Sequence, residues 1–240
     1  MRPVKIFSLT RKTESEFKTG SYLAKSLENL DIKPVLEVVF ENDGENALGL
    51  SEFYNQAILE KSSPEDILLF IHDDVYIHQK NLVEAVNRAI ERFNIVGVAG
   101  NKSPDFRQPS WCLRFDKDLK STGWQVLTNL TGSVSHGSFE KPELVNYGES
   151  PARCKLLDGL FLAIDADVLK KSKIKFDPRF KFHCYDIDFS RQAYKAGLSL
   201  GTWPIELTHQ SSGSYDSPSF REAARAYLEK WQVKIPGSKG

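Results

Sequence analysis

The sequence has no net charge, few cysteines and no CxxC spacing. Its 240 residues include 32 lysines and arginines and 32 aspartates and glutamates, so the formal net charge is zero. General nucleic-acid binders carry a basic excess, and we therefore expect no nucleic-acid partner. The three cysteines, Cys112, Cys154 and Cys184, are odd in number, which argues against a disulfide framework or a structural zinc site and favours free thiols.

Long apolar runs are also missing. No stretch approaches the roughly 20 apolar residues that a membrane-spanning helix needs. The first residues enter a strand pattern directly, without the apolar segment of a signal peptide. We therefore expect a cytoplasmic protein with no transmembrane segment, which would meet a membrane only by peripheral contact.

The first half of the chain alternates apolar strands with amphipathic helices. The segment Ile67 to Ile71 is wholly apolar, which is typical of a central parallel strand covered on both faces. Alternation of this kind predicts an α/β fold with a single open, twisted, Rossmann-like sheet flanked by helices. Strands are predicted at 4–9, 34–40, 67–71 and 95–99, and helices at 13–30, 50–61 and 79–93.

The second half has a different pattern. Between Pro104 and Arg153 the predicted strands are short, and glycine, serine, proline and aromatic residues are frequent. We interpret this region as the wall of a substrate pocket, although its aromatic residues would equally serve a homodimer contact. A strand at 156–164, a helix at 187–196, one or two strands within 198–208 and a closing helix at 218–231 follow, before a frayed tail at 236–240.

Polar side chains follow several of the predicted strands, where ligands bind in open α/β sheets. The strongest group is His72-Asp73-Asp74, directly after the most hydrophobic strand. Two neighbouring carboxylates repel each other and are costly to desolvate, and a divalent cation relieves both costs. Their oxygen atoms suit Mg²⁺ or Mn²⁺. The alternative is a solvated turn that caps a helix.

Two further polar groups lie later in the chain. Asp186 and Asp188 stand at the start of a predicted helix, where the helix dipole favours anions. Residues two apart point to different faces of a helix, so one aspartate would brace the scaffold while the other faces the pocket; simple capping is the alternative. His209 ends a strand and precedes a polar Gly/Ser loop, which suits phosphate contacts or a moving lid.

These segments, in this order and spacing, resemble bacterial glycosyltransferases of the GT-A fold, family 2-like, including sugar transferases of capsule and cell-surface polysaccharide synthesis. Phe70-Ile71-His72-Asp73-Asp74-Val75 resembles the DxD-type metal motif, with Asp74 at the metal-binding Asp and His72 at the first Asp. Tyr185-Asp186-Ile187-Asp188-Phe189 resembles the "ED" helix start, with Tyr185 at the Glu and Asp186 at the Asp. The helix after Gly49 resembles one that begins near the nucleotide, with Asn55 as the matching Asn.

The resemblance covers most of the chain and implies a UDP-sugar donor, a saccharide acceptor and Mn²⁺ or Mg²⁺. Its catalytic base would be Asp186, as in inverting members, and His209 resembles a late histidine that adds a metal ligand. Residues 1–235 would form one domain, with a nucleotide-binding half at 1–103 and an acceptor-binding half at 104–235. The implied site residues are Asp74, His209 and His72 for the metal, Thr10, Arg11, Glu41, Asn42, Asn55 and Asp73 for the nucleotide, and Asp158 and Trp111 for the acceptor.

Two other functions compete with sugar transfer. A nucleotidyltransferase would normally carry a glycine-rich basic loop after the first strand, whereas the segment Ser8 to Thr13 is basic but contains no glycine. A non-catalytic sugar-nucleotide-binding module would be consistent with His72 and Tyr185 in place of the two acidic residues of the family pattern.

Overall fold

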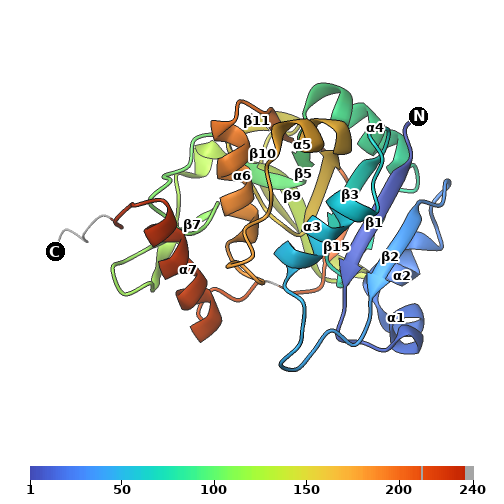
Figure 1. Cartoon of the computed structure of the whole chain (residues 1–240), viewed down its shortest axis with the longest axis horizontal. Helices are drawn as coiled ribbons and strands as arrows, with labels where there is room; N and C mark the ends of the chain where they lie inside the picture. Colours follow the sequence, from blue (N-terminus) through green and yellow to red (C-terminus); the bar gives the residue numbers. More distant parts are fainter. Residues whose placement is uncertain (212, 236–240) are drawn as a thin grey trace.

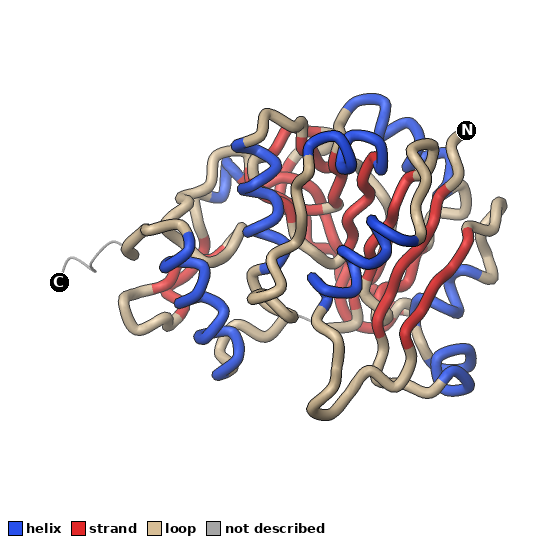
Figure 2. Tube along the Cα trace, viewed as in Figure 1, coloured by secondary structure: helices blue, strands red, loops and turns tan. Residues whose placement is uncertain are grey.

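A seven-stranded mixed sheet forms the centre of the protein (Figures 1 and 2), in a computed structural model that describes residues 1–211 and 213–235. Strand β1 is parallel to β2 and β3, whereas β13 is antiparallel to β3 and β5. The predicted frayed tail, 236–240, lies outside the described residues. In spatial order the strands are β11 (Ala152–Cys154), β14 (Leu200–Thr202), β5 (Ile95–Gly97), β13 (Phe161–Asp165), β3 (Ile67–Ile71), β1 (Val4–Leu9) and β2 (Val35–Val39).

The wholly apolar segment 67–71 is the core strand that its sequence predicts. Every residue of β3 is fully buried, because neighbouring strands flank it and helices cover the sheet on both faces. Helix α3 (Leu50–Glu60) contacts β1 and α5 (Ala166–Ser172) in front of the sheet, and α4 (Leu82–Arg92) contacts β5 and β13 from behind (Figure 1). The prediction of an open twisted sheet flanked by helices is confirmed, except that β13 and β11 run antiparallel to their neighbours and make the sheet mixed.

A second, six-stranded sheet continues from the first. The chain passes directly from β3 into β4 through residues 72–74, from β5 into β6 through Val98, and from β12 into β13 through 158–160. The polar segments therefore lie at the junction of the two sheets. The second sheet contains β12 (Leu156–Leu157), β6 (Ala99–Asn101), β9 (Leu130–Ser138), β15 (Leu207–His209) and β4 (Val75–Ile77), with β10 (Lys141–Gly148) paired to β9.

Three predicted elements are each divided in the structure. The strand expected at 95–99 is split at Val98 into β5 and the start of β6, which belong to different sheets. The helix expected at 13–30 is α1 (Glu14–Gly20) and α2 (Tyr22–Leu27), separated by Ser21 in an extended conformation. Ser21 ends α1, and its side chain caps α2 by accepting a hydrogen bond from the Ala24 amide. The strand expected at 156–164 is interrupted where the Asp158 carboxylate accepts a hydrogen bond from the Leu160 amide at 2.9 Å.

The remaining elements pack beside the sheets. Helix α6 (Tyr185–Lys195) contacts β12 and β14, and α7 (Pro218–Lys230) lies near the hairpin of β7 (Leu113–Phe115) and β8 (Ser121–Trp124) at the left of Figure 1. A short 3-10 turn, η1 (Leu127–Asn129), precedes β9. All three cysteines are buried and free, as predicted. Among the described residues, no helix has the length and apolarity to cross a membrane.

Candidate functional site

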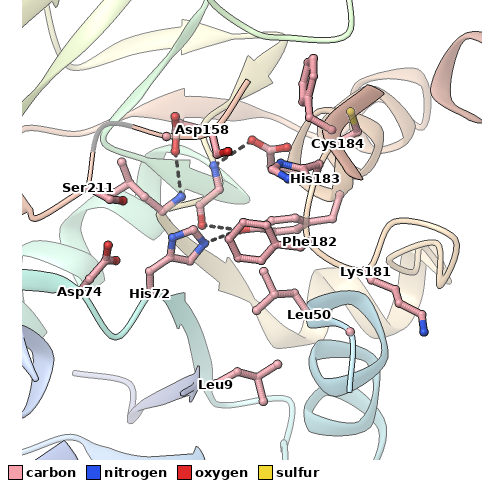
Figure 3. A pocket seen from close by; sticks show the side chains of 18 of the residues that line it. Leu9, Leu50, His72, Asp74, Asp158, Lys181, Phe182, His183, Cys184 and Ser211 are labelled. Atoms are coloured by element: carbon pink, nitrogen blue, oxygen red, sulfur yellow. Dashed lines mark hydrogen bonds between the residues drawn. The ribbon is translucent and has the colours of Figure 1, made fainter. Parts of the chain in front are cut away.

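A cavity of about 580 Å³ opens at the junction of the two sheets, within the size range of small-molecule sites. The ends of β1 and β3, the 158–160 linker, the loop before α6 and the segment after β15 all line it (Figure 3). It therefore gathers segments that are far apart in the sequence. The predicted site residues that line it are Thr10, Arg11, Asn42, His72, Asp73, Asp74, Trp111, Asp158, Asp186 and His209.

Three of these side chains form a cluster with the composition of a metal site. His72, Asp74 and His209 each offer one ligand atom, and these atoms lie within 4.8 Å of one another. His209 Nε2 is 3.3 Å from Asp74 Oδ1 and 3.0 Å from Ser211 Oγ. Two imidazoles and one carboxylate, from the 72–74 segment and the end of β15, fit a divalent first-row cation that keeps open positions for a ligand.

The charges of this cluster are mutually stabilising. Burial opposes ionisation of both Asp74 and His209, but the hydrogen bond between them raises the pKa of His209 and holds the pKa of Asp74 well below its usual range. Burial lowers the pKa of His72, so its imidazole is neutral at pH 7. A neutral imidazole has a lone pair available for a cation.

A pair of carboxylates stands on the other side of the cavity. Asp158 accepts hydrogen bonds from the Trp111 indole Nε1 at 2.6 Å and from the Leu160 amide, and Asp186 accepts one from the Gly159 amide at 3.1 Å. Burial, followed by the negative charge of Asp158, raises the pKa of Asp186 to about 7. A carboxylate with such a pKa is suited to accept a proton near neutral pH.

The second aspartate of α6 has a structural environment. Asp188 is fully buried and accepts hydrogen bonds from Lys230 Nζ at 2.7 Å, Trp231 Nε1 at 2.9 Å and Gln192 Nε2 at 2.8 Å. Asp188 thus ties α6 to α7, whereas Asp186 lines the cavity. This is the division between a bracing and a pocket-facing aspartate that helical geometry predicts.

Replacing Asp188 with alanine should destabilise the protein without altering the cavity. The change leaves Trp231 Nε1 without its acceptor, whereas Lys230 keeps Asp177 at 2.8 Å, and a buried donor left unsatisfied costs about 1–3 kcal/mol. We expect that loss in the free energy of unfolding, measured by urea denaturation at 25 °C. A loss below about 1 kcal/mol would contradict the bracing role.

The nucleotide side of the prediction centres on Asp73. Its Oδ2 accepts hydrogen bonds from Thr10 Oγ1 at 2.7 Å and Lys12 Nζ at 2.8 Å, which joins the ends of β1 and β3. Asn42 also lines the cavity, but its side-chain amide bonds the backbone of Leu48 in both directions. Asn42 therefore shapes the loop before α3.

The structure does not bring Glu41 or Asn55 to the cavity. Glu41 is exposed, with a left-handed backbone at φ 51°, and is not among the lining residues. The Asn55 side chain donates to the carbonyl of Phe176 and accepts from its amide, at 2.8 Å and 3.0 Å. Asn55 thereby fastens α3 to the chain before α6, and its expected nucleotide contact is corrected to a bracing contact.

Several lining residues were absent from the predicted site. Lys12, Lys181 and Phe182 line the cavity, although the Lys181 side chain points away from His72 (Figure 3). Phe182 is 57 % exposed, and its ring stacks on His72 at 6.1 Å between centroids. Lys12 lies in the basic segment after the first strand, and this position could have identified it as a site residue. Nothing local in the sequence marks Lys181 or Phe182, because the loop before α6 reaches the cavity only through the fold.

Comparisons with known proteins identify the family and the fold. A family model described as "Glycosyltransferase like family" matches residues 24–211. No curated protein matches the chain. Among solved structures, GalNAc-T7 with UDP, GalNAc and Mn²⁺ has a TM-score of 0.54 and 11 % identity, over 95 % of this chain and 48 % of that chain.

Two further structures are similar at lower scores. S. aureus TarS 1–349 in complex with UDP has a TM-score of 0.48 and 14 % identity, over 94 % of this chain and 65 % of that one. A197 from STIV has a TM-score of 0.47 and 10 % identity, over 88 % and 86 %.

The similarity to GalNAc-T7 concerns the fold, which is the GT-A fold of glycosyltransferases, and this chain spans about half the length of that protein. The family match is independent of it and covers most of the sequence. It includes the lining residues between Asn42 and Ser211, but not those at the end of β1 or after Ser211. The chain belongs to this glycosyltransferase-like family.

Proposed function

We propose that the protein transfers a sugar from a UDP-sugar donor to a hydroxyl of a saccharide acceptor, with inversion at the anomeric carbon. The observation that carries this proposal is that a candidate metal cluster and a candidate general base line the same cavity. The cluster of His72, Asp74 and His209 suits a cation that holds a diphosphate, and Asp186 on another wall has the raised pKa of a general base.

The donor is assigned to the side of the cavity at the ends of β1 and β3. Thr10, Arg11 and Lys12 line that side, with Asp73 holding Thr10 and Lys12 in place. Lys12 and Arg11 supply positive charge for phosphate oxygens. GalNAc-T7, which has the same fold, was crystallised with UDP, GalNAc and Mn²⁺, and this supports a uridine nucleotide and a divalent ion here.

The ligand set favours Mn²⁺ over Mg²⁺. Two of the three candidate ligands are imidazoles, and imidazole nitrogen suits transition-metal ions better than it suits Mg²⁺. Asp74 would supply the anionic oxygen, while His72 and His209 would supply nitrogen. When bound, the ion neutralises charge on the departing diphosphate.

The protein residues would carry the rest of the reaction. Asp186 accepts the proton of the acceptor hydroxyl as its oxygen bonds to the anomeric carbon, and the bond from that carbon to the diphosphate breaks on the opposite face. Burial, with the charge of Asp158 second, maintains the raised pKa of Asp186. Trp111 orients Asp158 through the indole hydrogen bond, so both residues are assigned to the acceptor side.

A thermal-shift screen of UDP, GDP, CDP and dTDP, each with and without Mn²⁺, tests the donor assignment. UDP with Mn²⁺ should give the largest increase in Tm. At 100 times its Kd, a ligand stabilises by about 2.7 kcal/mol, or roughly 5–10 °C for a chain of this size. Equal shifts for all four nucleotides, or none with Mn²⁺, would refute it. Release of pyrophosphate from a nucleoside triphosphate and a sugar phosphate would instead identify a nucleotidyltransferase.

A further inference from the structure

The two positions at which the chain departs from the GT-A sequence pattern are in direct contact. His72 follows β3 and Tyr185 begins α6, 113 residues later, yet the Tyr185 hydroxyl lies 2.9 Å from His72 Nε2 (Figure 3). Neither residue carries the carboxylate of the family pattern. Their contact indicates that the two departures act together.

The hydrogen-bond partners determine which ring nitrogen of His72 carries the proton. The Tyr185 hydroxyl also lies 2.9 Å from the carbonyl oxygen of Gly159. A carbonyl only accepts, so the single hydroxyl proton of Tyr185 is donated to Gly159. The hydroxyl therefore accepts from His72, which means that Nε2 of the imidazole is protonated and Nδ1 holds the lone pair.

The free nitrogen faces the candidate metal cluster. In Figure 3 the ring nitrogen of His72 that makes no hydrogen bond lies on the side of Asp74. Histidines that bind metals characteristically direct their other N–H to a fixed acceptor, which sets both the tautomer and the orientation of the ring. Tyr185 supplies such an acceptor from a different element of the fold.

The surroundings hold Tyr185 rigidly in this role. The side chain is only 3 % exposed, and its ring packs against Tyr54 and Phe176. A Cβ on Gly159 would lie 2.3 Å from the Tyr185 hydroxyl, so the absence of a side chain at Gly159 is what allows the hydroxyl to reach the carbonyl.

A glutamate at this position would not be equivalent. Its carboxylate would accept from His72 but would have no proton to donate to Gly159. It would also add a negative charge beside Asp186 and Asp158. Tyrosine bridges the same gap without that charge.

We infer that Tyr185 is a positioning residue that fixes His72 as the Nε2–H tautomer, with the Nδ1 lone pair directed at Asp74 and His209. The inference deepens the proposed function, on which its relevance to metal binding rests. The tautomer itself is a property of the metal-free protein and is measured separately.

The experiment compares Tyr185→Phe with Tyr54→Phe. Both changes remove one hydroxyl from adjoining buried rings, but of the two only the Tyr185 hydroxyl bonds His72 and the Gly159 carbonyl. Long-range ¹H–¹⁵N NMR of histidine-labelled, metal-free protein at pH 7.5 reports each tautomer, and the His72 signals are assigned with His72→Gln. Mn²⁺ affinity is then measured by calorimetry.

The wild type and Tyr54→Phe should show His72 as the Nε2–H tautomer, and Tyr185→Phe should show a mixture or the Nδ1–H form. Mn²⁺ affinity should fall roughly 10- to 100-fold in Tyr185→Phe only, as is usual for loss of an outer-shell partner. An Nδ1–H tautomer in the wild type, or an unchanged tautomer in Tyr185→Phe, overturns the inference. A wild type that shows the Nε2–H tautomer but binds no Mn²⁺ supports the positioning role and contradicts the proposed metal instead.

Discussion

Replacement of Asp186 by asparagine is expected to lower kcat for sugar transfer by about 10²- to 10⁴-fold, the range that a positioned general base contributes. The asparagine amide keeps the size of the side chain but accepts no proton. Because the proposed donor site is on the other side of the cavity, the affinity for UDP with Mn²⁺ should remain within about twofold, a factor that corresponds to less than 0.5 kcal/mol. Single-turnover kinetics and calorimetry measure the two quantities separately.

The pH dependence of transfer gives an independent check on this assignment. Burial and the charge of Asp158 raise the pKa of Asp186 to about 7, and the base works only when it is deprotonated. The wild-type kcat should therefore rise with pH through about 7 and level off above it. The residual rate of Asp186→Asn should not follow that curve.

The stability of Asp186→Asn distinguishes lost chemistry from lost folding. The pKa of Asp186 is higher in the folded protein than the usual value of about 4 for an unfolded chain. Folding is therefore disfavoured progressively as pH rises from about 4 to about 7, and that penalty persists above pH 7. Asp186→Asn removes the penalty, so at pH 8 its Tm should equal or exceed that of the wild type. If Asp186→Asn transfers sugar at nearly the wild-type rate, Asp186 is not the base. Asp158 would then be the next candidate, because Asp188 is paired with Lys230.

The sequence predicts a site residue correctly where the pattern of one strand or one helix is enough to place it. The apolar run of β3 determines where the His72 to Asp74 segment emerges, because a fully buried strand must place its polar continuation at the sheet edge. Helical periodicity likewise separates the roles of Asp186 and Asp188. Each conclusion needs only the pattern within one segment.

The parts that sequence reasoning misses depend on contacts between distant segments. Asn55 occupies a helix that begins at the cavity, yet its amide meets the backbone of Phe176, 121 residues away. The interruption at Asp158 places β12 and β13 in different sheets. Strand propensity within the segment does not predict this, because it does not say with which strands a segment pairs. The bond between Tyr185 and His72 is invisible until the fold places α6 against the end of β3.

Replacement of Asp74 by alanine is expected to abolish the Mn²⁺-dependent binding of UDP. Asp74 supplies the anionic ligand of the candidate cluster, and its removal leaves two neutral imidazoles. The affinity for Mn²⁺ should fall by more than the 10- to 100-fold typical of outer-shell changes. In a thermal-shift assay, the additional stabilisation that Mn²⁺ gives to UDP should disappear.

The neighbouring carboxylate provides the matched control. Asp73 holds Thr10 and Lys12 and does not belong to the cluster. Asp73→Asn should therefore weaken UDP binding while Mn²⁺ alone still binds, whereas Asp74→Ala should lose the binding of Mn²⁺ itself. If both variants lose Mn²⁺ equally, Asp73 would be a ligand too, and the cluster would need to be redrawn.

The pKa of His209 tests the contact between Asp74 and His209 in the metal-free protein. Although burial works against protonation, the hydrogen bond and charge of Asp74 raise the pKa of His209. Asp74→Ala removes both effects and leaves the burial opposed only by the charge of Asp158, so the pKa of His209 should fall. An NMR titration of metal-free protein measures this shift. A pKa that does not move would mean that Asp74 and His209 are not paired, and a cation held between them would lose its structural basis.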